Sequence, residues 1–63
     1  MCEANAYVYH DGVEELYLEG VDILKPEGDG LLLRSLFGEQ KIFEGGIREV
    51  SLLHHKIVLE KRS

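Results

Sequence analysis

The chain has 63 residues, 44% of them hydrophobic and 30% charged, which is enough for one small domain (residues 1–63) and too apolar for a disordered segment. A single cysteine excludes an internal disulfide, and the one cysteine with three scattered histidines does not match the spacings of a closed structural zinc site. The net charge of −5 makes nucleic acid and anionic membranes unlikely partners, because both are bound through Lys and Arg.

Short apolar runs separated by turn residues occupy the chain from its start. Residues 2–10 alternate between two faces, as in a half-buried strand, and Asp11-Gly12 predicts a hairpin turn after them. Further strands are expected at residues 13–18, 21–25, 31–36, 40–44, 47–53 and 56–60. The range 47–53 also fits helical spacing, but a lone two-turn helix between glycines is marginal, so we predict a strand there. The pattern predicts an all-β fold, a small antiparallel β-barrel built as a meander of about six or seven short strands.

The cellular compartment and the oligomeric state follow from what the chain lacks. The first residues contain neither a basic segment nor an apolar run, and the longest apolar stretch, residues 31–33, is far too short to span a membrane. With one cysteine, this predicts a cytoplasmic protein with no membrane partner. A chain this short buries only about 60% of its unfolded surface, so self-association is expected to stabilise it, and we predict a homodimer.

Cys2 is the residue best suited to chemistry. If Met1 is removed, the Cys2 amine and thiolate form one five-membered chelate. If Met1 is retained, its amine and the amide and thiolate of Cys2 form two fused chelates. Planar nitrogen and sulfur ligands suit Ni(II) and Cu(II) better than Zn(II). One chain supplies two or three ligands, so two chains meeting at their first strands would complete four. The alternative is a cysteine that packs as a small hydrophobe.

The other polar residues give weaker signals. His54 and His55 are adjacent and point to opposite faces in an extended strand, although a turn could bring them together; the alternative is polar residues at a hairpin tip. His10 lies about 26 Å from Cys2 along a straight strand, too far to share a metal. The sequence contains no catalytic triad order and no phosphate-binding loop, so we predict that the protein is not an enzyme.

A different class of function is an RNA-binding or protein-interaction module with no metal role. Small barrels bind RNA through exposed aromatic residues beside a basic groove, and three tyrosines could form such a platform. The candidates are Tyr7, Tyr9 and Tyr17, flanked by Arg34, Lys41, Arg48 and Lys56. Cross-strand packing explains tyrosines in strands equally well, and the acidic balance argues against the RNA-binding alternative.

The opening Met1-Cys2-Glu3-Ala4, running directly into an apolar strand, resembles the start of CooT-type proteins. These are small nickel-binding accessory proteins associated with maturation of carbon monoxide dehydrogenase. The resemblance extends over nearly the whole chain, through the Gly/Asp-rich loop before residues 31–33, the segment 36–39 (Leu-Phe-Gly-Glu) and the final hairpin.

The resemblance implies a homodimeric β-barrel that binds Ni(II) through Cys2. It suggests the backbone nitrogens of Met1 to Glu3 as co-ligands, and a nickel metalloenzyme, carbon monoxide dehydrogenase, as the recipient. The family has also been described as RNA-binding, which keeps that alternative open. We therefore predict a metallochaperone or nickel buffer whose metal site, formed by Cys2, Met1 and Glu3, is shared between two chains.

Overall fold

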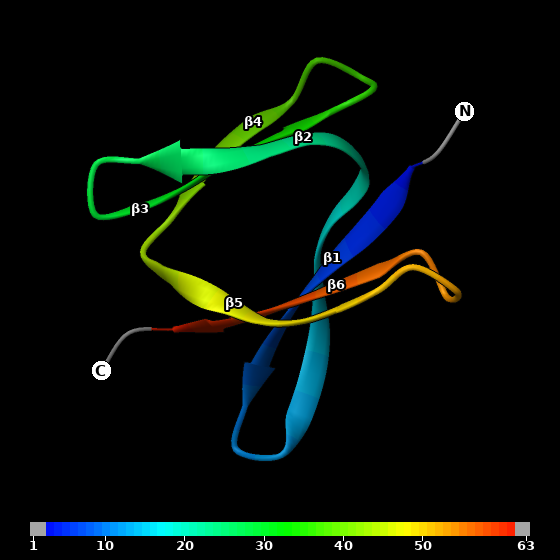
Figure 1. Cartoon of the computed structure of the whole chain (residues 1–63), viewed down its shortest axis with the longest axis vertical. Helices are drawn as coiled ribbons and strands as arrows, with labels where there is room; N and C mark the ends of the chain where they lie inside the picture. The colour runs from blue at the N-terminus through cyan, green and yellow to red at the C-terminus, as the bar shows by residue number, and fades with distance from the viewer. Residues whose placement is uncertain (1–2, 62–63) are drawn as a thin grey trace.

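The computed structural model describes residues 3–61, which form one curled sheet of six strands (Figure 1). The strand order across the sheet is β4-β3-β2-β1-β6-β5. The strands are β1 (Ala4–His10), β2 (Val13–Glu27), β3 (Gly30–Ser35), β4 (Gln40–Phe43), β5 (Gly45–Ser51) and β6 (Lys56–Lys61). The all-β prediction is therefore confirmed, and the sheet curls into a half-barrel.

The strand β2 is longer than the sequence predicted. The two strands expected at 13–18 and 21–25 are one strand of 15 residues, which bends at Gly20. Gly20 has φ of +63°, a conformation that residues with a Cβ rarely adopt, and its N–H donates to Asn5 Oδ1 at 3.1 Å. Because the chain bends without leaving the sheet, one strand pairs with β1 in its first half and with β3 in its second half.

The predicted hairpin turn at Asp11-Gly12 is confirmed. His10 and Val13 are opposite one another, and the two residues between them have φ of +50° and +80°. Positive φ at both central residues is the mark of a type I′ turn, which matches the twist of the flanking strands.

The pairing of β1 with β6 is parallel, which a simple meander does not produce. Asn5 lies opposite Lys56 and Tyr9 opposite Glu60, so the first and last strands run in the same direction side by side. All the other strand pairs are antiparallel. The chain passes from β4 to β5 at a single residue, Glu44, and so crosses from one edge strand of the sheet to the other. This crossing is tight: a Cβ on Gly45 would collide with the Glu60 carbonyl and the Phe43 ring.

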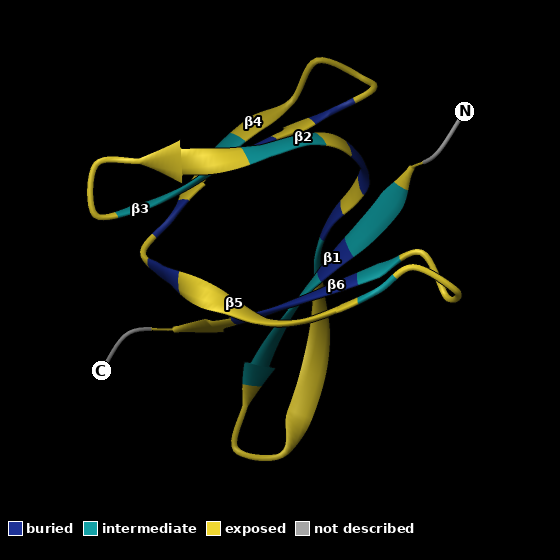
Figure 2. Cartoon of the chain, in the orientation of Figure 1, coloured by how far each residue is buried: buried dark blue, intermediate teal, exposed yellow. Residues whose placement is uncertain are grey.

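The hydrophobic core lies inside the curl, where the bend in β2 and the β4–β5 crossing bring the strands around it (Figure 2). Ala6, Leu33 and Leu59 are fully buried there. The complete core cluster comprises Ala6, Leu18, Val21, Leu33, Phe43, Ile57 and Leu59. The alternating apolar residues of the expected strands thus supply the core, since every second side chain of a strand points to the same face.

Candidate metal-binding end of the sheet

Of the three predicted metal-site residues, the structure describes only Glu3. Cys2 and Met1 lie outside the described residues. Glu3, the third predicted site residue, is exposed and immediately precedes β1. It borders a hollow of about 330 Å³ that is also lined by Asn5, His54 and His55, which we call the N-terminal hollow. The structure therefore places carboxylate, amide and imidazole groups around the position where the chain enters the sheet.

The β5–β6 connection, residues 52–55, reaches this end because β1 and β6 are parallel. We call this connection the histidine loop. The Asn5 N–H donates to the His55 carbonyl at 3.0 Å, which joins the loop to the second residue of β1. In Figure 1 the loop and the start of β1 lie at the same end of the sheet. The sequence left open whether a turn brings the two histidines together, and the structure shows both lining the N-terminal hollow.

The two histidines are positioned in different ways. His54 Nδ1 lies 3.0 Å from Ser51 Oγ, and the His54 N–H donates to the same oxygen at 3.4 Å. His55 has φ of +53°, an unusual backbone conformation for a residue with a side chain. Among residues 3–61, no three His, Cys, Asp or Glu side chains are arranged to hold a metal ion. The histidines therefore need a further donor before they can complete a site.

His10 is at the other end of β1 and does not take part in this arrangement. It is the last residue of that strand, and its Nε2 lies 3.2 Å from the carboxylate of Asp11 in the hairpin turn. The seven residues of β1 span about 20 Å at ~3.3 Å per residue. His10 is thus separated from the N-terminal hollow by the length of the strand, as the sequence predicted.

Exposed apolar side chains surround the same end of the sheet. Phe37 is 81% exposed and Leu52 is 84% exposed. A Cβ on Gly20 would lie 3.1 Å from the Phe37 ring and 3.8 Å from the Glu3 carboxylate, so Phe37 and Glu3 both lie close to the bend in β2. Next to Glu3 is a second hollow of about 290 Å³ with mostly apolar walls. Its lining residues are Glu3, Ala4, Val21, Val50, Ser51, Leu52, His55, Lys56 and Ile57.

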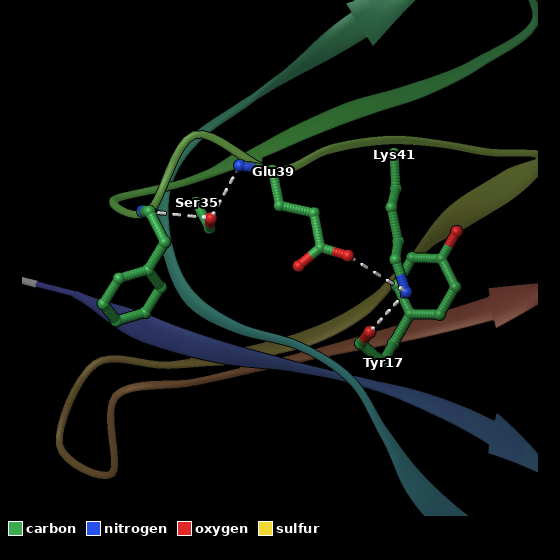
Figure 3. A network of polar contacts seen from close by, with 5 residues as sticks. Tyr17, Ser35, Glu39 and Lys41 are labelled. Atoms are coloured by element: carbon green, nitrogen blue, oxygen red, sulfur yellow. Dashed lines mark hydrogen bonds and ion pairs between the residues drawn. The ribbon is translucent and has the colours of Figure 1, made fainter.

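A buried serine fixes the turn that carries Phe37 (Figure 3). Ser35 is 2% exposed, and its Oγ accepts hydrogen bonds from the backbone N–H groups of Phe37 and Glu39, both at 3.1 Å. The turn is joined to β2 through the Leu36 N–H, which donates to the Gly20 carbonyl at 2.8 Å. The exposed aromatic ring is thus presented by a well-anchored turn.

The three tyrosines do not form a single platform. Tyr17 packs on the core, with its ring 5.4 Å from that of Phe43 in an edge-to-face arrangement. Tyr7 and Tyr9 alternate with the core-facing Ala6 along β1 and so belong to the other face of the sheet. RNA-binding aromatics need to share one accessible surface, so this arrangement does not favour the RNA-binding alternative.

Each tyrosine ring is also covered by a basic side chain of the same chain. Lys56 Nζ lies 5.2 Å from the centre of the Tyr7 ring, the Arg48 guanidinium 3.9 Å from that of Tyr9, and Lys41 Nζ 4.6 Å from that of Tyr17. These are cation–π contacts, and each occupies one of the two ring faces on which a base could stack.

All three of these cations have further partners. Arg48 Nη1 donates to Glu60 Oε2 at 3.2 Å. Lys41 Nζ donates to the Tyr17 carbonyl at 3.0 Å and lies 4.0 Å from the Glu39 carboxylate (Figure 3). Lys56 pairs with Glu14, and the hydrogen bond that its ammonium donates to this carboxylate raises the pKa of Lys56 above its ordinary value of 10.5. The basic side chains are therefore engaged within the sheet.

No helix long and apolar enough to cross a membrane is found in the part of the chain that the structure describes.

Comparison with known proteins assigns the family. A sequence model described as "CO dehydrogenase accessory protein CooT" matches residues 1–60. The crystal structure of a protein assigned as CooT from Carboxydothermus hydrogenoformans has a TM-score of 0.93 and 42% identity to this chain, covering 98% of this chain and 100% of the other. An uncharacterized protein of Methanocaldococcus jannaschii is 38% identical over 60 residues, which is 95% of this chain and 98% of the relative. The chain therefore belongs to the CooT family of CO dehydrogenase accessory proteins, which confirms the predictions of the family and of a non-enzymatic role.

Proposed function

We propose that two copies of this chain hold one Ni(II) ion through Cys2, and that they buffer or deliver it for the maturation of carbon monoxide dehydrogenase. The observation that carries the proposal is the exposed end of the sheet at Glu3, where imidazole, amide and carboxylate donors gather directly after the only cysteine. Membership of an accessory family of CO dehydrogenase supplies the recipient.

The chemistry of the donors fits nickel as the cargo. The Cys2 thiolate and the backbone nitrogens from Met1 to Glu3 offer sulfur and nitrogen ligands, and imidazole is also a good nickel ligand. Two chains would provide two thiolates and at least two nitrogens, enough for a square plane. Cu(II) binds such ligands at least as well on the Irving–Williams order, so the proposal does not include selectivity of nickel over copper.

The exposure of this end supports transfer of the ion. Delivery requires that a ligand from the recipient replaces one from the carrier, which an open position permits and a closed cavity hinders. The net charge of −5 also favours the approach of a cation.

The apolar surroundings of this end support a homodimer. Phe37, Leu52 and Val50 are 81%, 84% and 47% exposed, which is unusual for large apolar side chains of so small a protein. A second copy that brings its own Cys2 to the same ion would cover these side chains, and their burial would stabilise the pair.

The test is a Ni(II) titration of the reduced, full-length protein, followed by ultraviolet-visible absorption and by mass in solution. We expect thiolate-to-nickel charge-transfer bands that saturate at one nickel per two chains, with the mass of a dimer. Because a thiolate must lose its proton to bind, the affinity should fall as the pH is lowered. Cys2→Ser should remove the bands and the affinity together.

An unchanged nickel affinity in Cys2→Ser would refute the proposal. In that case a labelled single-stranded RNA, added to the metal-free protein, tests the alternative function. Binding that weakens as salt is raised would indicate an RNA-binding module, since release of counterions from phosphates makes such binding strongly salt-dependent.

A further inference from the structure

The dipeptide Asp-Gly occurs twice in the chain, at residues 11–12 and 29–30, and each copy lies at a hairpin turn. This dipeptide is chemically labile, because glycine has no side chain to hinder attack of its backbone nitrogen on the carboxyl group of the preceding aspartate. The attack closes a five-membered succinimide ring. One fold therefore presents the same reactive pair in two different surroundings.

The two turns place the glycine of this pair at different positions. In the turn over residues 10–13 Gly12 is the third residue, whereas in the turn over residues 27–30 Gly30 is the fourth. The hydrogen bond of a β-turn runs from the N–H of the fourth residue to the carbonyl of the first. The N–H of Gly30 is therefore engaged at the start of β3, and the N–H of Gly12 is left out of the corresponding bond.

The space around the two glycines differs in the same direction. A Cβ at Gly12 would meet nothing within 4 Å, whereas a Cβ at Gly30 would collide with the Phe43 carbonyl of β4. The side chains of His10 and Asp11 are 72% and 88% exposed, so the 3.2 Å contact between them is a weak one that does not hold the carboxylate in place. The turn at Asp11 thus has room for the ring, and the backbone at Gly30 is packed.

We propose that Asp11 is a site of spontaneous isomerisation to isoaspartate, and that the fold protects Asp29 from the same reaction. The Gly12 nitrogen forms a bond to Asp11 Cγ, the bond from Cγ to one carboxyl oxygen breaks, and this oxygen leaves as water together with the amide proton. Water then opens the succinimide. Attack at Cγ restores aspartate, whereas attack at the main-chain carbonyl leaves the chain running through Cγ, which is isoaspartate. The only other reactant is water, which is lost in the first step and regained in the second.

Isomerisation would change the β1–β2 hairpin itself. The register of a hairpin is set by its turn, and residues 11 and 12 both have the positive φ of a two-residue type I′ turn. Isoaspartate adds one carbon to the backbone between these residues, which this turn does not accommodate. The turn lies at the end of β1 remote from the N-terminal hollow, so the inference is independent of nickel and of the proposed function.

The experiment is incubation of the full-length, metal-free protein at physiological temperature and neutral pH for several weeks, with a parallel sample unfolded in guanidinium chloride. Peptide mapping with electron-transfer fragmentation distinguishes aspartate from isoaspartate at each position. In the folded protein, residue 11 should isomerise at least about 10-fold faster than residue 29, because the Gly30 N–H must first leave a backbone hydrogen bond. In the unfolded sample the two rates should become similar, since both sites have the same dipeptide.

Asp11→Asn and Asp29→Asn are matched variants that report the same ring closure by mass alone. Asparagine tolerates turn positions and forms the same succinimide with loss of ammonia, so each conversion raises the mass of the chain. In the folded proteins Asp11→Asn should convert at least about 10-fold faster than Asp29→Asn. The isoaspartyl form of the wild-type protein, separated by ion-exchange chromatography, should melt at a lower temperature than the unmodified form.

Two results would overturn the inference. If residue 29 isomerises as fast as residue 11 in the folded protein, the position of the glycine in the turn does not control the reaction. If isoaspartate forms at residue 11 only in the unfolded sample, the turn protects this site and the proposal is wrong. Neither result bears on nickel binding, which the Cys2→Ser titration tests separately.

Discussion

Ser35→Ala is expected to destabilise the fold by about 2 kcal/mol. The hydroxyl of this buried residue accepts two backbone N–H groups, those of Phe37 and Glu39. A buried N–H left without a partner costs about 1–3 kcal/mol, and water can reach this partly buried turn, so about 1 kcal/mol for each group is the reasonable value. A chain of 63 residues has a free energy of unfolding of only about 3–9 kcal/mol, so the variant should still fold but with a much smaller free energy of unfolding.

The assay is equilibrium unfolding in urea, followed by far-ultraviolet circular dichroism. With a slope of about 1 kcal/mol per molar urea, as expected for the smallest domains, the midpoint should fall by about 2 M. The melting temperature should fall by ~8–16 °C, at about 4–8 °C per kcal/mol for a domain of this size.

Ser51→Ala provides the matched control. The hydroxyl of Ser51, the last residue of β5, also accepts a backbone N–H, but from His54 in the exposed histidine loop, so its removal should change stability by no more than about 0.5 kcal/mol. If Ser35→Ala is as stable as Ser51→Ala, water replaces the hydroxyl without cost, and the anchoring role that we assign to Ser35 is wrong.

Two further changes test other parts of the sheet. Gly45→Ala should destabilise the protein by about 1–3 kcal/mol, because the added Cβ has no room at the β4–β5 crossing. A Cβ added at Gly46 meets nothing within 4 Å, so Gly46→Ala should be tolerated. Equal melting temperatures for the two variants would refute this account. Glu14→Gln should lower the pKa of Lys56 towards 10.5 in an NMR titration, and Glu15→Gln should not. The pKa of Lys56 is raised in the folded state, so the stabilisation by the Lys56–Glu14 pair is complete below about pH 10.5 and is lost as the pH rises through the pKa that Lys56 has in the folded protein. Above about pH 10.5, the wild-type protein should therefore lose more stability than Glu14→Gln. A pKa of Lys56 that is the same in all three proteins would show that the ion pair is not formed in solution.

The sequence predicted most of the strands because their signals are local. Alternation of apolar residues along β1 and the Asp11-Gly12 pair depend only on neighbouring residues, and both features are confirmed. The bend at Gly20 was predicted as a strand boundary, because a glycine between two apolar runs is typical of a turn as well as of a bent strand. The local pattern of residues cannot distinguish a turn between two strands from a bend within one strand, because the difference depends on which strands pair with each half.

The candidate site was only partly predictable. The prediction of Cys2 as a metal ligand rests on its position in the sequence, whereas the approach of His54 and His55 to the beginning of β1 depends on the parallel pairing of the first and last strands. That pairing joins residues almost a whole chain length apart, and no short-range signal marks it. The sequence pattern around the two histidines is therefore that of an ordinary hairpin tip, although the His55 carbonyl accepts a hydrogen bond from Asn5 of β1.

The pairing of β1 with β6 also has a consequence for the order in which the protein forms during synthesis. Asn5 and Lys56, which are neighbours in the ladder, are 51 positions apart, so β1 lacks one of its two partner strands until the last part of the chain has been made. Closing so long a loop is slow compared with forming the β1–β2 hairpin, which needs only local contacts. A growing chain thus makes the histidine loop and β6 long after β1. A nascent or truncated chain that ends before residue 54 lacks both histidines of the N-terminal hollow, so only a completed and folded copy can present them beside Glu3.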